Sequence, residues 1–69
     1  MDITAPLSGR IVSINIEAGQ SVEEDDEIIV IEAMKMETPI YAPADGTITD
    51  VLVSVGDEVD EDDVLAIIE

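Results

Sequence analysis

The chain contains APLSGRIVSINIEAGQSVEEDDEIIVIE at residues 5–32 and, at a constant offset of 37 residues (42 − 5), APADGTITDVLVSVGDEVDEDDVLAIIE at residues 42–69. The two segments align without a gap, and glycines, apolar residues and acidic runs recur at the same places. The matched positions are Ala5-Pro6 with Ala42-Pro43, Gly9 with Gly46, Ile11 with Ile48, Gly19 with Gly56, Val22 with Val59, Glu24-Asp25-Asp26 with Glu61-Asp62-Asp63, and Ile31-Glu32 with Ile68-Glu69. Such an internal repeat predicts two copies of one supersecondary unit, related by a pseudo-two-fold axis.

Each copy has the pattern of β-strands. Within residues 10–16, apolar side chains alternate with the polar Ser13 and Asn15, and residues 47–53 are the counterpart in the second copy. Such alternation favours strands with one buried face. The short branched runs Ile28–Ile31 and Val64–Ile68 are typical of buried strands, and glycines mark the turns between runs. We therefore expect an all-β fold: a flattened β-barrel or sandwich of two four-stranded antiparallel sheets. Residues 23–27 are too few for a stable helix, so we predict a turn there.

Residues 33–41 join the two copies, and the repeat contains no partner for Lys35, because that partner would fall at position 72 (35 + 37) of a 69-residue chain. We predict a single domain over residues 1–69, with halves 5–32 and 42–69 joined by a hairpin over residues 33–41. The hairpin tip then carries Lys35 between Met34 and Met36, at the end of the molecule away from both chain termini.

The composition excludes several functions. The chain has no Cys and no His, so it lacks disulfides, thiolate metal sites and the usual general base. Eighteen acidic residues against two basic ones give a net charge of −16, which argues against nucleic acid and anionic membranes as partners. We see no signal peptide, and the apolar run Ile28–Ile31 is too short to span a bilayer, so we expect a cytoplasmic location. The acidic run Asp60–Asp63 lacks the ligand spacing of a calcium loop, and we predict a solvated turn without a metal.

Lys35 is the only lysine, and apolar methionines flank it at the predicted tip. Exposed hydrophobic side chains commonly mark contact sites. The alternative is that Met34 and Met36 fold back into the core and that Lys35 is an ordinary surface charge.

The sequence EAMKME at residues 32–37 resembles the attachment site of biotinyl domains, the biotin carboxyl carrier protein family within the biotin/lipoyl attachment superfamily. The resemblance covers essentially the whole chain, including the duplicated halves and the glycine turns. It implies that biotin is joined to Lys35 by an amide bond and that the chain is a carrier rather than an enzyme. It further implies that Met34 and Met36 condition the reaction of the cofactor, whereas Glu32 and Ala33 match the family's preceding positions.

The same resemblance implies three protein partners: biotin protein ligase, a biotin carboxylase, and a carboxyltransferase or decarboxylase subunit. The gapless repeat leaves no room for the inserted "thumb" of bacterial acetyl-CoA carboxylase carriers, which favours an acyl-CoA or pyruvate carboxylase or a decarboxylase as the parent enzyme. Leu7-Ser8 and the two acidic turns depart from the family's common pattern. Two alternatives stay open: a lipoyl carrier, whose tip usually reads Asp-Lys-Ala, and an unmodified adaptor barrel.

The acidity also predicts dependence on salt. Clustered carboxylates repel one another, and the screening length falls from about 10 Å at roughly 0.1 M salt to about 3 Å at roughly 1 M. We predict that the protein comes from a salt-rich cytoplasm. The alternative is an acidic carrier matched to a basic partner surface.

Overall fold

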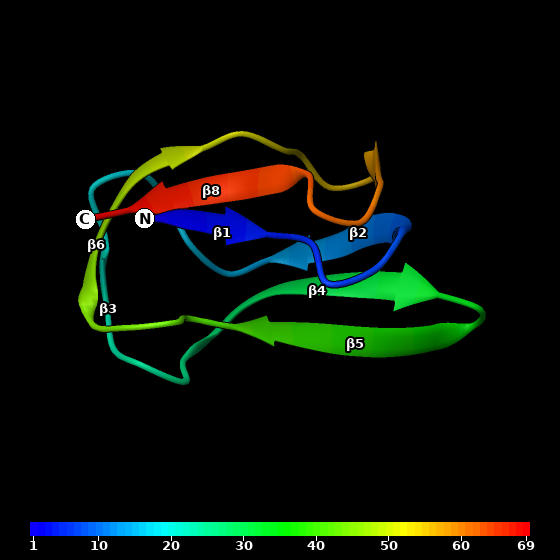
Figure 1. Ribbon diagram of the computed structural model, residues 1–69, viewed down its shortest axis with the longest axis horizontal. Coiled ribbons are helices and arrows are strands. Elements are labelled where there is room, and N and C mark those ends of the chain that lie inside the picture. The colour runs from blue at the N-terminus through cyan, green and yellow to red at the C-terminus, as the bar shows by residue number, and fades with distance from the viewer.

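The computed structural model describes residues 1–69 and contains eight strands and no helix, hence no helix able to cross a membrane. Six strand pairings, all antiparallel, build two four-stranded sheets with the orders β1-β8-β6-β3 and β5-β4-β2-β7 (Figure 1). The predicted all-β fold of two such sheets is confirmed. The strands are β1 (Asp2–Thr4), β2 (Gly9–Ile14), β3 (Ser21–Val22), β4 (Glu27–Ala33), β5 (Met36–Tyr41), β6 (Gly46–Val51), β7 (Glu58–Val59) and β8 (Val64–Ile68).

The pseudo-two-fold symmetry is confirmed in the backbone hydrogen bonds. The Ala5 N–H donates to the Asp63 carbonyl at 2.9 Å, and the equivalent Ala42 N–H donates to the Asp26 carbonyl at 2.8 Å. The two sheet orders are also related by the repeat. Exchanging β1 with β5, β2 with β6, β3 with β7 and β4 with β8 converts the order of one sheet into the order of the other. Each sheet therefore contains strands from both halves, and neither half is a separate unit.

The repeat extends further than the sequence indicated. The expected copies begin at residues 5 and 42, yet β1 occupies the position equivalent to residues 39–41. Ile3 pairs with Ala66 as Ile40 pairs with Ile29, and both partners differ by the same 37 residues (40 − 3 and 66 − 29). The sequence hides this equivalence because only the buried isoleucine is shared. The hairpin tip alone lacks a symmetric partner.

Two β-bulges change the phase of the predicted alternation. The register shifts between Ile11 and Ser13 in β2, and at the equivalent place between Ile48 and Asp50 in β6. Because a bulge adds one residue to one strand, Ile11 is fully buried while Val12 is only half-buried. The strands are also shorter than predicted, ending at Ile14 and Val51.

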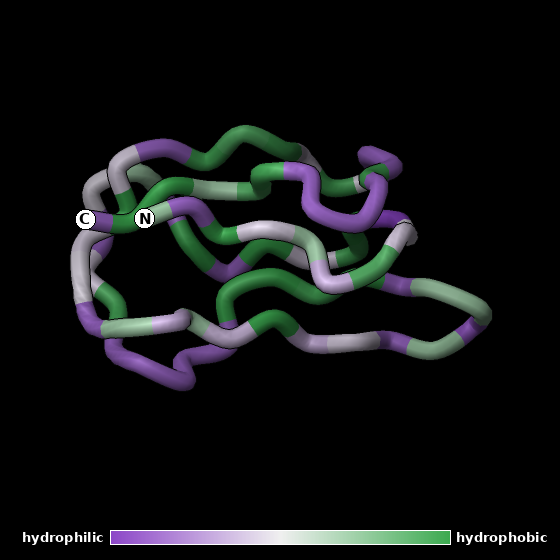
Figure 2. The backbone as a smooth tube through the Cα atoms, in the orientation of Figure 1, coloured by the Kyte–Doolittle hydropathy of each residue, from purple (hydrophilic) through white to green (hydrophobic).

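The core lies between the sheets and is entirely hydrophobic, with fifteen buried residues and no buried polar side chain. Figure 2 shows the apolar strand segments, in green, separated by strongly polar turns, in purple. Isoleucine dominates the core, which suits a sheet interior because branched side chains pack well on a pleated surface. The buried residues are Ile3, Ala5, Ile11, Ile16, Val22, Ile28, Ile29, Ile31, Ile40, Ala42, Ile48, Val59, Leu65, Ala66 and Ile68.

The acidic runs form tight turns, as predicted for residues 23–27. Asp25 and its counterpart Asp62 have positive φ values of 71° and 72°, a conformation that aspartate tolerates better than most residues. The Asp26 carboxylate accepts a hydrogen bond from the Glu23 N–H at 2.9 Å, and the second half repeats this contact. Part of the negative charge therefore has a local structural role.

Candidate functional site

The candidate site is the tip of the β4–β5 hairpin. Ala33 pairs with Met36, so Met34 and Lys35 form a two-residue loop. Both loop residues have positive φ, 52° for Met34 and 65° for Lys35. Two positive φ values define the type I′ turn, which matches the twist of a hairpin and prefers Asn-Gly. Left-handed backbone costs most residues about 1–2 kcal/mol each, so Met34 and Lys35 form a strained turn.

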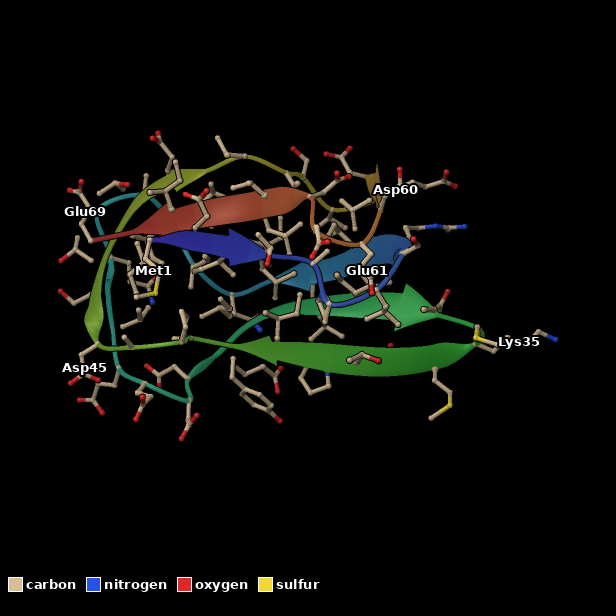
Figure 3. The ribbon with its side chains drawn as sticks, viewed as in Figure 1. Met1, Lys35, Asp45, Asp60, Glu61 and Glu69 are labelled. Carbon is tan, nitrogen blue, oxygen red and sulfur yellow. The ribbon has the colours of Figure 1, made fainter.

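The tip side chains extend into solvent. Met34 is 95% exposed and Met36 is 70% exposed, so the alternative in which both methionines fold into the core is wrong. Lys35 is exposed and points away from the body of the molecule (Figure 3). The hairpin thus displays one amine between two unprotected thioethers.

Glu32 and Ala33 lie at the base of the tip. Glu32 is exposed and stands opposite Glu37 on one side and Arg10 on the other. Ala33 is half-buried beside β2, where a Cβ added to Gly9 would lie 3.2 Å from the Ala33 Cβ and 2.5 Å from the Glu32 carbonyl oxygen. This close approach requires glycine at position 9, and it fixes the base of the hairpin against β2.

The opposite end of the molecule holds both chain termini (Figures 1 and 3). The Met1 amino group donates a hydrogen bond to the Ile68 carbonyl at 2.8 Å, which ties the first residue to β8. The molecule measures 31 × 19 × 18 Å, so the termini and Lys35 are separated along its longest axis.

The surroundings of the tip provide no enclosed reaction site. The surface has no pocket, and no group of three or more acidic, His or Cys side chains is placed to hold a metal ion. One accessible amine on a fixed hairpin suits the presentation of a covalently attached group to other proteins, because such a group brings its own chemistry.

Known proteins are similar to this chain in sequence. The sequence model of a family described as "Biotin-requiring enzyme" matches residues 1–68. A biotin-dependent acyl-coenzyme A carboxylase alpha3 subunit from Mycobacterium leprae is 45% identical over 38 residues, which are 55% of this chain and 6% of that protein. The gamma subunit of glutaconyl-CoA decarboxylase from Acidaminococcus fermentans is 44% identical over 38 residues, 55% of this chain and 26% of that subunit.

A solved structure supports the fold over its full length. The lipoyl domain of the 2-oxoglutarate dehydrogenase complex from Azotobacter vinelandii superimposes with a TM-score of 0.85 at 28% identity, covering 100% of this chain and 95% of that domain. The two protein relatives above are much longer than the segment they share with this chain.

Proposed function

This chain belongs to the biotin/lipoyl attachment family, and from that membership we propose that it is a biotin carboxyl carrier in which Lys35 holds biotin. It is a small carrier domain of the kind found in multi-component enzymes and is not itself catalytic. The observation that carries the proposal is the tip: the only lysine of the chain, fully presented on a strained two-residue turn between exposed methionines.

The geometry supports a transfer role. Biotin, when bound, supplies the ring nitrogen that accepts and releases the carboxyl group. The chain's own residues do the positioning. Gly9 holds the hairpin base against β2, the turn directs the Lys35 side chain outward, and the rigid body behind it keeps the arm accessible. Tethering raises the effective concentration of the carried group at every active site within reach.

We propose three partners in a cytoplasmic setting: biotin protein ligase, which forms the amide bond, a biotin carboxylase, and a carboxyltransferase or decarboxylase subunit. The carboxylase and decarboxylase relatives support the last two. Met34 and Met36 are proposed to condition the carboxyl transfer, while Glu32 and Ala33 form the base of the displayed turn.

A lipoyl carrier is the second candidate, because the lipoyl domain shares the fold over nearly its whole length. Met34-Lys35-Met36 favours biotin over lipoate. The test gives the purified chain biotin, ATP and a biotin protein ligase in one tube, and lipoate, ATP and a lipoate ligase in another, followed by intact mass.

We expect one biotin per chain, no lipoyl group, and no biotin on a Lys35→Arg variant, which keeps the charge but offers no acceptor amine. Biotin on that variant, or lipoyl transfer in preference to biotin, contradicts the proposal.

A further inference from the structure

A row of four charged side chains crosses the outer face of the sheet β5-β4-β2-β7 beside the tip. In register across the strands, Glu58 stands opposite Arg10, Arg10 opposite Glu32, and Glu32 opposite Glu37. All four are exposed. Directly opposite residues on one face of a sheet have Cβ atoms about 5 Å apart, so these side chains form one continuous surface, here called the charged row.

The symmetric half shows that the fold does not require this pattern. The equivalent row consists of Ser21, Thr47 and Glu69, with Thr47 in the place of Arg10. Thr47 is exposed and exchanges backbone hydrogen bonds with Glu69 at 2.6 and 2.8 Å. The same strand crossing therefore forms with a neutral side chain opposite an acid, which leaves Arg10 without a necessary structural role.

The position of Arg10 relative to Lys35 is equally informative. These two residues are the only side-chain cations against eighteen acids, and both lie at the tip end, since Arg10 pairs with a residue three positions before Lys35. An amide bond at Lys35 removes its charge and takes the net charge from −16 to −17. On a loaded carrier Arg10 is then the only positive side chain, and it lies opposite Glu32 on the strand that pairs with β4.

We propose that the charged row is the docking surface for the biotin carboxylase that acts on the biotinylated Lys35 arm, and that this enzyme places a carboxylate against Arg10 between basic side chains that face the glutamates. The proposal rests on the proposed carrier function. The planar guanidinium binds a carboxylate through two parallel hydrogen bonds. These bonds set the orientation of the bound carboxylate in addition to attracting it. The general acidity of the carrier attracts a basic surface from a distance, and the single arginine sets the register of the contact.

The test moves the arginine without changing the composition. In the double variant Arg10→Thr/Thr47→Arg the guanidinium lies at the symmetric position, on the end of the molecule away from Lys35, and the net charge stays at −16. The wild-type chain and the double variant are each biotinylated to completion. Each is then given as substrate to the source organism's biotin carboxylase with bicarbonate and MgATP, and the rate of ADP release is measured as a function of carrier concentration. Free biotin as the substrate reports the integrity of the enzyme, and a thermal melt reports the fold of each carrier.

We expect the KM for the double variant to rise about tenfold at low salt with kcat unchanged, and the difference to disappear near 1 M KCl, where the screening length is about 3 Å. Equal KM values at low salt overturn the docking proposal. If the double variant melts early, Arg10→Gln takes its place with the same expected rise. Failure of the wild-type chain to accept biotin contradicts the carrier function instead, so the two proposals fail separately.

Discussion

Replacing Met34 by Asn relieves the strained tip, and we expect it to stabilise the protein. Met34 has a φ of 52° and is 95% exposed, so the change removes an unfavourable backbone fit without losing buried surface. A left-handed conformation costs an ordinary L-residue about 1–2 kcal/mol, and Asn avoids much of that penalty. We expect a gain of about 1 kcal/mol in the free energy of unfolding, which corresponds to a Tm increase of about 4–8 °C in a domain of this size.

The matched control is Met36→Asn at the same tip. Met36 is 70% exposed and begins β5, where its φ is not positive and Asn is a poor strand former. Thermal melts followed by circular dichroism, at one fixed KCl concentration, should therefore show a higher Tm for Met34→Asn and an equal or lower Tm for Met36→Asn. A rise of the same size in both variants, or no rise in the first, refutes the argument from turn strain. A rise confined to Met34→Asn means that this methionine is retained at the expense of stability, as expected for a functional residue.

Three further outcomes are expected. Replacing Met34 and Met36 together by Leu keeps the side-chain volume and removes the sulfurs, so biotin attachment by the ligase should be nearly unchanged while carboxyl transfer per biotin falls. If the attachment rate collapses and transfer per biotin is normal, the assigned roles are reversed. Thermal melts in KCl from low to multimolar concentration should show a rising Tm, because the net charge of −16 is screened, and a flat Tm removes the salt-rich origin and favours docking to a basic partner. Gly46→Ala should lower the Tm strongly, because the added Cβ would lie 2.5 Å from the Glu69 carbonyl oxygen. The control is Ala44→Ser at a half-buried loop position, which should change the Tm little.

The sequence by itself determined the strand-rich repeat, the turns and the place of Lys35 between the halves. These features depend on local rules: alternation marks strands, and glycine and aspartate mark turns. The offset of 37 residues carried the symmetry, because both halves must bury the same pattern of side chains. Biotin as the group carried by Lys35 came from family resemblance and remains a prediction.

The tertiary structure alone decided the features that depend on strand register. The bulges that turn Ile11 inward, the equivalence of β1 with the end of β5, and the close approach at Gly9 all arise from pairing between distant segments. The strain at Met34 and Lys35 was equally hidden, because Met-Lys is not a turn sequence that local preferences would select. The alignment of Arg10 with Glu32 and Glu58 joins residues separated by 22 and 48 positions (32 − 10 and 58 − 10), and side-chain composition carries no information about which strands lie next to each other.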